Sequence, residues 1–310
     1  ASFFPTMPVD FKPWKGIWDA CPWATAFASP LWHAVTEEIE PEDASFEWKG
    51  IITPLRKIKL AKGLLSGYES SVPGVPAGPI ALKVPDAATI EAYWQELLRR
   101  TGGKFLIHLP PNSPFINAVF RKTEIYTHIL NISEKDKKMS KHHRDRMKKA
   151  QKAGVYVTPG LRDEDFEAYM DMYNASLQRW KTKPARIYPQ DFFQRVREIL
   201  VPADSAGFFI AWKDIKPQAG SLVLYGHKRA VSWHTVRADD SVRGANQLLN
   251  WTIMEQAAKR GITEFDFGPS PRMEGVAKFK ERFGAELESQ ITIVGPARLF
   301  SSYFLRRARQ

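Results

Sequence analysis

Two residues whose side chains can accept and release protons, His234 and Asp266, lie in strand-like runs of this 310-residue chain. His234 alternates with Trp233 along AVSWHTV, and Asp266 lies between Phe265 and Phe267 near the end of a short apolar run. An imidazole or a carboxylate at such a position can act as a general base, or it can be a structural residue of a sheet. We find no Ser-His-Asp order, metal-ligand spacing or Walker loop in the sequence.

A second stretch, SVRGANQLL at 241–249, has the features of an anion-binding turn. Arg243 and Gly244 come directly before an apolar run of helical character. A helix that begins at such a turn presents free backbone N–H groups and the positive end of its dipole to an anion or a carbonyl oxygen. We therefore expect a binding site for one of these groups at this turn.

The positive charge of the chain is concentrated after residue 130. The net charge is +11, and residues 1–130 contain 13 Lys/Arg and 13 Asp/Glu, so the second half holds the whole excess. The densest block is 135–152, KDKKMSKHHRDRMKKAQK, which we expect to be one helix between Ser133 and Gly154. This basic block is either a solvated helix or a surface that binds a polyanion, because cations this dense repel one another. Its helical spacing predicts one narrow buried stripe: Met139, His143, Met147 and Ala150.

The composition is that of a globular protein. The chain is 44% hydrophobic and 25% charged, which is enough apolar material for one large core or two of ordinary size. There is no run of about eighteen apolar residues and no signal-peptide pattern, so we expect a cytoplasmic protein without stable membrane insertion. Cys21 is the single cysteine, which excludes an internal disulfide and a cysteine-rich zinc site.

The elements that would position these residues occur twice along the chain. From Trp94 and again from Trp251 the sequence reads helix, strand, loop, helix, strand, and each second helix has an aromatic residue followed by a cation: Phe120-Arg121 and Phe279-Lys280. We therefore predict an α/β protein with mixed sheets and two tandem domains. The expected boundaries are 1–133, 134–295, and a tail at 296–310 that packs back on the first domain.

Three strands joined by hairpins are expected before the Arg243-Gly244 turn, at 206–213, 220–227 and 230–237. An antiparallel meander followed by a turn, a helix and a strand resembles the GNAT fold of acyl-CoA N-acyltransferases, whose turn holds the coenzyme pyrophosphate. The turn of that family has further glycines that let the backbone approach the pyrophosphate, whereas this one has only Gly244. This departure argues against a standard coenzyme A cradle.

Over nearly its full length the chain resembles the Fem-type aminoacyltransferases of peptidoglycan bridges, which have two GNAT-like domains. The resemblance is carried by four segments: 74–82, 126–155, 169–193 and 246–284. Members of the family take an amino acid from aminoacyl-tRNA and form an amide on an amine of a cell-wall precursor. The resemblance implies the same reaction here, with a phosphate-bearing amine as acceptor and no metal or cofactor.

The resemblance also implies roles for individual residues. Lys280 would stabilise the oxyanion that forms when an amine attacks the ester carbonyl, worth about 3 kcal/mol. Alternatively it is a surface lysine that pairs with Glu281 or Glu286. With His234 and Asp266 as candidate bases, the remaining site residues are expected to bind substrate. The donor would contact Arg243, Gly244, Asn246 and Phe279. The acceptor would contact Arg179, Lys181 and Arg186. The tRNA would contact Lys141, Arg144, Lys148 and Lys149.

Two other functions remain open. An acyl-CoA-dependent N-acyltransferase acting on a polysaccharide or metabolite amine would have the same fold, and a tRNA- or nucleic-acid-binding module without catalysis would have the same basic block. Ten tryptophans could stack on bases in such a module. They are scattered, however, and most fall in apolar periodic runs, as core residues do.

Overall fold

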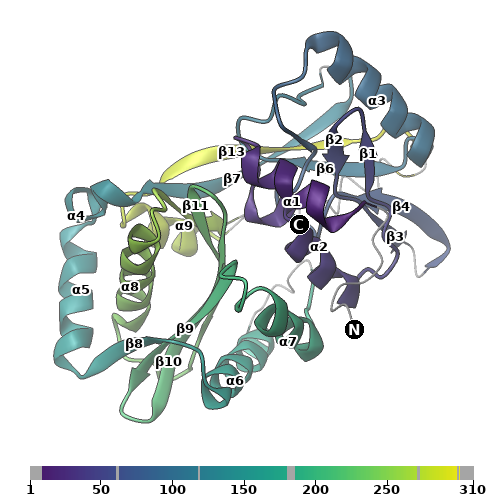
Figure 1. Ribbon diagram of the computed structural model, residues 1–310. Helices are drawn as coiled ribbons and strands as arrows, with labels where there is room; N and C mark the ends of the chain where they lie inside the picture. Colours follow the sequence, from purple (N-terminus) through teal and green to yellow (C-terminus); the bar gives the residue numbers. More distant parts are fainter. Residues whose placement is uncertain are drawn as a thin grey trace. The chain divides into compact units, whose positions relative to one another are not determined.

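A computed structural model describes residues 9–60, 63–117, 119–179, 186–270, 273–298 and 300 (Figure 1). The chain forms two compact units, each a mixture of helices and strands, so the predicted α/β class is confirmed. Unit 1 consists of residues 1–125, 184–199 and 289–310, and unit 2 of residues 126–183 and 200–288. Compared with the predicted domains, 1–133 and 134–295, unit 1 contains 184–199 and 289–295 from the second predicted domain, and unit 2 contains 126–133 from the first.

Unit 1 is built around a crossover between two parallel strands. β3 (Arg56–Leu60) pairs antiparallel with β4 (Leu65–Glu69), and β4 pairs parallel with β6 (Phe105–Leu109), which pairs antiparallel with β13 (Glu286–Val294). A small antiparallel sheet contains β1 (Phe46–Trp48), β2 (Ile51–Thr53) and β5 (Ile80–Ala81). Unit 1 also contains the helices α1 (Phe11–Ala20), η1 (Ala26–Ala28), α2 (Pro30–Val35), η2 (Thr36–Glu38) and α7 (Gln190–Ile199).

The crossover helix of unit 1 is α3 (Ala87–Thr101), and its ends follow from its sequence. The Asp86 side chain accepts a hydrogen bond from the Thr89 N–H at 2.7 Å, and Gly102 ends the helix in the left-handed conformation. Its buried face includes Trp94, which packs in the core with other aromatic side chains. Phe300, in the first part of the predicted tail, is buried beside Leu106 of β6. Residues 301–310 lie outside the described residues.

Unit 2 has the strand order β7-β12-β11-β10-β9-β8. The predicted meander is present as β9 (Ala206–Lys213), β10 (Lys216–Tyr225) and β11 (Arg229–Arg237), all antiparallel. After β11, helix α8 (Ala245–Lys259) leads to β12 (Glu264–Pro269), which is parallel to β11 and antiparallel to β7 (Arg121–Asn131). The other elements are η4 (Ile132–Glu134), α4 (Lys135–Lys138), α5 (Lys141–Lys152), β8 (Val155–Pro159), α6 (Asp163–Arg179) and α9 (Glu274–Glu281).

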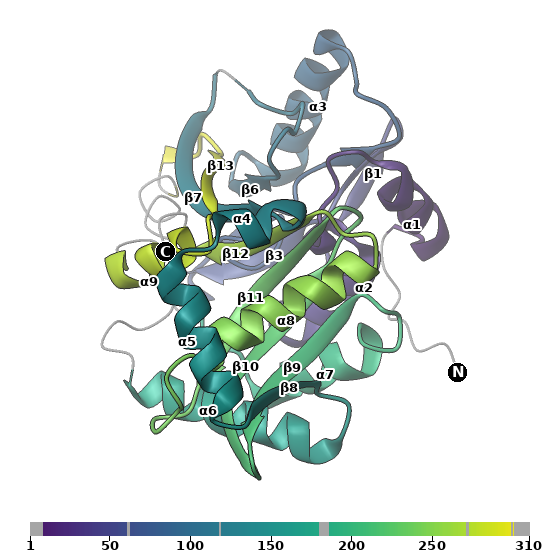
Figure 2. The same ribbon diagram turned by 90° about the vertical axis from the view of Figure 1, so that its left-hand side faces the viewer.

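Helices cover both faces of the unit 2 strands (Figure 2). Alternate side chains of a strand point to opposite faces. Phe208 of β9 packs edge to face on Tyr169 of α6, whereas Phe209 belongs to the core that contains Leu248 and Leu249 of α8. Helix α5 lies on the α8 side, beside α8.

The basic block forms two helices, not one. α4 ends before Met139, and α5 begins after Ser140, whose hydroxyl accepts a hydrogen bond from the His143 N–H at 3.3 Å. The Ser140 N–H donates to the Arg282 carbonyl, so a distant segment sets the break. Gly154, at φ 83°, follows the end of α5 as predicted. The predicted stripe is buried at all four positions: Met139, His143, Met147 and Ala150.

The predicted repeat holds for its helix and following strand, but its second helix is absent from the first copy. β7 begins at Arg121, and the described residues of 110–120 contain no helix. Pro110, Pro111 and Pro114 remove backbone donors there, and Asn112 has φ 62°. Within the described residues, no helix has the length and apolar character needed to cross a membrane.

Candidate functional site

The chemically interesting residues of unit 2 gather where β12 separates from β11. The two strands pair only from Arg229↔Glu264 to Val231↔Asp266. Just beyond Val231, the register between β10 and β11 shifts at Trp233, and the register of β12 with β7 shifts between Asp266 and Pro269. Irregularities of this kind often lie beside active sites, because they re-aim side chains and end the pairing.

Asp266 is the acidic residue at this point, and it is 3% exposed. Its Oδ1 accepts hydrogen bonds from the Thr127 hydroxyl of β7 and from the Gly268 N–H, the latter at 2.7 Å. Burial raises the pKa of Asp266, while the Thr127 hydrogen bond and the charges of Arg229 and Lys280 oppose that rise. The carboxylate therefore fixes the end of β12 and places negative charge near Lys280.

Lys280 of α9 is a buried cation, not a surface lysine. It is 6% exposed, and its Nζ donates to the carbonyls of Gly268 at 2.7 Å and Pro269 at 3.2 Å. The alternative partner Glu286 pairs instead with Lys138 at 2.6 Å. Burial lowers the pKa of Lys280 to about 8, opposed by Asp266, so the ammonium is mostly protonated at pH 7. An ammonium has three N–H donors, and one of them has no partner among the described residues.

Packing against α5 holds α9 in place. Phe279 and Phe283 both contact the ring of His143, with centroids 5.0 and 4.7 Å away, and the Phe279 carbonyl lies 3.0 Å from the His143 Nε2. Phe283 is fully buried. The ring of Phe279, expected at the donor site, thus packs against His143 of α5.

Three arginines from separate elements are near enough for their charges to interact: Arg146 of α5, Arg243 of the turn before α8 and Arg282 after α9. Burial lowers the pKa of Arg146, and the charges of the other two lower it further. The pKa of the neighbouring His142 is lowered by burial and by the same three charges. Among the described residues, none of the three guanidinium groups has a carboxylate partner. We call Arg146, Arg243 and Arg282 the arginine cluster.

The single glycine of the turn is explained by α5. Gly244 has φ 102°, and a Cβ placed on it would lie 2.2 Å from the Arg146 carbonyl oxygen. Gly284, at φ 88°, is similar, because its Cβ would lie 2.2 Å from the Lys138 Cβ. Both glycines therefore let the basic block dock against the ends of α8 and α9. Asn246, also expected at the donor site, lies in the first turn of α8, where its Oδ1 accepts from Asn250 at 3.1 Å.

His234, a candidate base, lies on β11 with its ring against Trp233 and Tyr173, at centroid distances of 4.4 and 5.9 Å. Burial lowers its pKa to about 4, so it is neutral at pH 7. It comes three residues after Val231, the strand partner of Asp266, which is roughly 10 Å along a strand. Its place in a common site with Asp266 stays a prediction.

The residues expected to bind the acceptor do not form one patch within one unit. Arg179, in unit 2, bonds to Asp239, to the Arg237 carbonyl at 2.7 Å and to the Ser176 hydroxyl at 2.9 Å. Arg186, in unit 1, bonds to Glu40 and to the Ile39 carbonyl. Lys181 lies outside the described residues.

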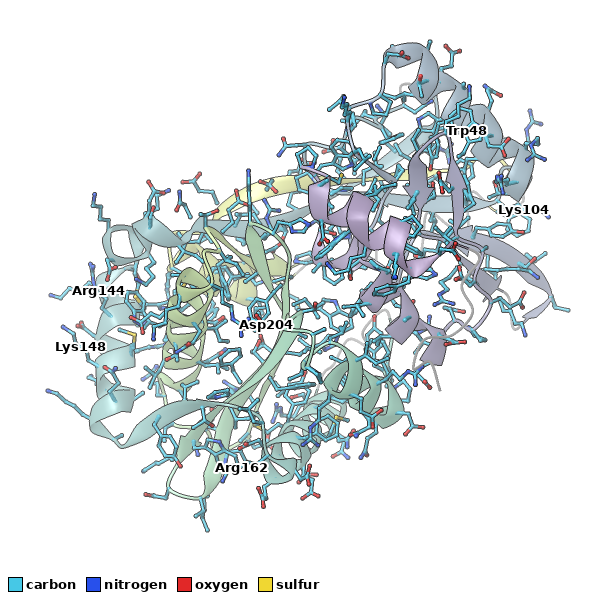
Figure 3. All side chains as sticks on the ribbon, in the orientation of Figure 1. Trp48, Lys104, Arg144, Lys148, Arg162 and Asp204 are labelled. Carbon is cyan, nitrogen blue, oxygen red and sulfur yellow. The ribbon has the colours of Figure 1, made fainter. Side chains whose placement is uncertain are left out.

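The cations expected to bind tRNA lie on α5. Lys141, Lys148 and Lys149 are exposed, and Arg144 is half-buried, with its Nη1 donating to the Asp136 carbonyl at 2.9 Å. Figure 3 shows the side chains of Arg144 and Lys148 directed away from α8. The exposed face of α5 is therefore a row of cations next to the arginine cluster.

The sequence analysis missed His128 of β7. It is 2% exposed, and neither ring nitrogen has a hydrogen-bond partner among the described residues. Burial and the charge of Lys280 both lower its pKa. The signal was present in YTHIL (126–130), where a histidine stands among apolar, aromatic and β-branched residues. Only the pairing of β7 with β12 brings it to the site.

Comparison with known proteins agrees with this architecture. Residues 137–281 match the family model described as an acetyltransferase (GNAT) domain, just under half of the chain. The fold is similar to a crystal structure of FemX, with a TM-score of 0.70 and 10% identity over 98% of this chain and 99% of that one. No curated protein matches the sequence.

Two further structures are similar over most of their length. The C-terminal domain of a putative lysylphosphatidylglycerol synthetase from Agrobacterium fabrum has a TM-score of 0.65 and 13% identity, covering 95% of this chain and 94% of that one. L-PGS from Bacillus licheniformis has a TM-score of 0.61 and 11% identity, covering 91% and 96%. The predicted resemblance to Fem-type, GNAT-like proteins is thus confirmed for the fold, and most of the segment that matches a GNAT domain lies in unit 2, with 184–199 in unit 1.

Proposed function

We propose that the protein is a GNAT-type acyltransferase that moves an aminoacyl group from aminoacyl-tRNA to an amine and forms an amide. The observation that carries the proposal is the geometry of Lys280. Its ammonium is buried at the end of β12 and held by two carbonyls, and its third N–H, which has no partner in the described part of the chain, would bind the ligand. The match of residues 137–281 to a GNAT domain supports transferase activity at this place.

The proposed reaction needs a cation at this position. As the amine attacks the ester carbonyl, negative charge develops on the carbonyl oxygen. A donor aimed at that oxygen from a site with little water contributes about 3 kcal/mol, or roughly a hundredfold in rate. Because Lys280 is already held by Gly268 and Pro269, it needs little reorganisation when the charge appears.

The arginine cluster favours a tRNA donor over coenzyme A. The one glycine of the turn accommodates α5, so its presence does not indicate close approach by a pyrophosphate. Phosphates near the start of α8 would instead bind side chains, namely three guanidinium groups without carboxylate partners. The exposed lysines of α5 extend this charge along the path of a polyanion. The names FemX and lysylphosphatidylglycerol synthetase, given to proteins of the same fold, are in keeping with an aminoacyl donor.

The proposed acceptor is an amine that also bears phosphate, such as a cell-wall precursor. Arg179 would contribute to its recognition with the N–H donors that its three internal bonds leave available. An acyl-CoA-dependent N-acyltransferase is the second candidate, because the matching family model is that of an acetyltransferase domain.

The deciding experiment compares two donors. Purified protein is mixed with charged total tRNA in one series and with acetyl-CoA in the other, and labelled acyl groups that reach amines of a cell extract are counted. We expect transfer from tRNA that disappears after RNase treatment. Transfer from acetyl-CoA alone would replace the proposal with its second candidate, and binding of tRNA without transfer in either series would leave a binding module.

A further inference from the structure

His128 differs from other buried histidines of the molecule. The two ring nitrogens of His108 lie 2.9 Å from Glu69 and 2.8 Å from Thr292. The Nε2 of His143 lies 3.0 Å from a carbonyl, and only its Nδ1 has no described partner. The two ring nitrogens of His128 are buried without a partner among the described residues. A buried polar group left unpaired costs about 1–3 kcal/mol, so native structures nearly always satisfy it or use it.

The position of His128 connects it to the site. On β7, Ile129 pairs with Asp266 and Thr127 pairs with Pro269, so His128, between them, lies across from the irregular part of β12. The carbonyls of Gly268 and Pro269, in that same part, hold Lys280. The Ser270 hydroxyl, next along the chain, is a second buried group without a described partner. Two unpaired polar groups thus flank the segment that holds the cation.

Burial, together with the charge of Lys280, keeps His128 neutral. α9 presents Lys280, whose charge lowers the pKa of His128, and Glu281, whose charge raises it, while burial is the largest effect and lowers it. Asp266 of β12 bonds to Thr127, whose side chain lies on the opposite face of β7 from that of His128. The imidazole ordinarily titrates near pH 6.5. With its pKa below that value, His128 carries a lone pair at pH 7 and can accept a proton.

We propose that His128 is the catalytic proton acceptor of the amide-forming step, an inference that rests on the transferase function proposed above. The acceptor ammonium first loses one proton to solvent. As the C–N bond forms, the nitrogen gives a second proton to His128, and Lys280 donates a hydrogen bond to the oxyanion. His128 then gives its proton to the ribose oxygen as the C–O bond breaks. The products are the amide, uncharged tRNA and one proton in solvent.

The first test is the pH profile of transfer from charged tRNA by the intact protein. Activity should fall on the acid side with an apparent pKa below 6.5, because protonated His128 cannot accept a proton. In His128→Gln this contribution to the acid limb should disappear, leaving only the fall that comes from protonation of the acceptor amine, and the rate at pH 7 should fall about a hundredfold, as for loss of a general base. His227→Gln, an exposed histidine after β10, is the matched control and should keep both rate and limb.

A second variant separates proton transfer from structure. His128→Ala should lose activity to a similar extent, and added imidazole should restore it at least tenfold, while Lys280→Ala should gain nothing from imidazole. A wild-type acid limb that comes only from protonation of the acceptor amine would overturn the assignment without touching the transferase proposal. Loss of activity in His128→Gln with the wild-type limb retained and no rescue of His128→Ala would also overturn it, in favour of a structural role. Absence of any transfer by the wild-type protein would remove the proposed function itself.

Discussion

Each unit contains a parallel crossover, β4-α3-β6 in unit 1 and β11-α8-β12 in unit 2, but the two crossovers treat their polar groups differently. In unit 1 the polar groups around His108, on β6, satisfy one another. Glu69 and Thr292 each contact one ring nitrogen of His108. The Ser70 hydroxyl accepts a hydrogen bond from the backbone N–H of His108 at 2.9 Å. In unit 2, His128 has no described partner and Lys280 keeps an N–H donor.

This difference between two units with the same crossover topology indicates which of them contains the reaction site. A polar network whose donors and acceptors are all paired with one another stabilises and orders its unit, and it has no unpaired group that could bind a substrate. A network with unused donors and acceptors carries a cost in stability that function can justify. We therefore place the reaction in unit 2 and a structural role in unit 1, and the following experiments can break or sharpen that division.

The largest effect is expected from Lys280→Ala. Removing the cation from the oxyanion should lower kcat for transfer from tRNA about a hundredfold or more, with tRNA binding retained, because the arginine cluster is intact. Lys278→Ala is the matched control, since Lys278 lies on the same helix, is exposed and pairs with Glu274. Single-turnover rates and filter-binding affinities measure the two properties. Equal rates for the two variants would contradict the assignment of Lys280.

The next effect concerns stability. His108→Ala should lower the free energy of unfolding by about 3 kcal/mol or more, because it takes a charged or hydrogen-bonding partner from the fully buried Glu69. His128→Gln should change it by less than about 1 kcal/mol, since no described hydrogen bond of the ring is lost. Urea unfolding of both variants measures the difference. Similar losses for the two would mean that unit 2 is as closed as unit 1.

The smallest effect is expected at the arginine cluster. Arg146→Gln and Arg282→Gln should each weaken tRNA binding, and each should reduce the slope of log affinity against log salt by about 1, as for loss of one phosphate contact. Lys216→Gln, at an exposed position of β10, is the charge-matched control and should leave the slope unchanged. Binding isotherms at several salt concentrations give the slopes. An unchanged slope in both arginine variants would remove the phosphates from this surface.

The parts of unit 2 that the sequence predicts correctly depend on local signals. The meander, the Arg243-Gly244 turn and α8 follow from alternation, a glycine and helical periodicity within short windows. Asp266 is predicted from its residue type near the end of a strand, and Lys280 from the Fem-type resemblance. The two lie only fourteen positions apart in the sequence, which is short enough to predict that they are near each other.

The parts that sequence patterns missed depend on distant partners. The break between α4 and α5 is tied to the carbonyl of Arg282, far along the chain. His128 reaches the site only through the pairing of β7 with β12, and the arginine cluster needs three separated elements. The expected helix at Phe120-Arg121 failed because a proline-rich stretch before it favours an extended start to β7. The hydrophobic periodicity of a short stretch of sequence cannot show which distant residues it will contact.

The exchange of strands between the units sets an order for folding during synthesis. β7 follows β6 in the chain yet pairs with β12, and β13 follows β12 yet pairs with β6. A growing chain has produced all of unit 2 once residue 288 has emerged, but unit 1 still needs the rest of β13. Although its first residues are made earliest, unit 1 is the last to be completed. During that wait β6 presents an unpaired edge, where a nascent chain is open to wrong pairing and to chaperones.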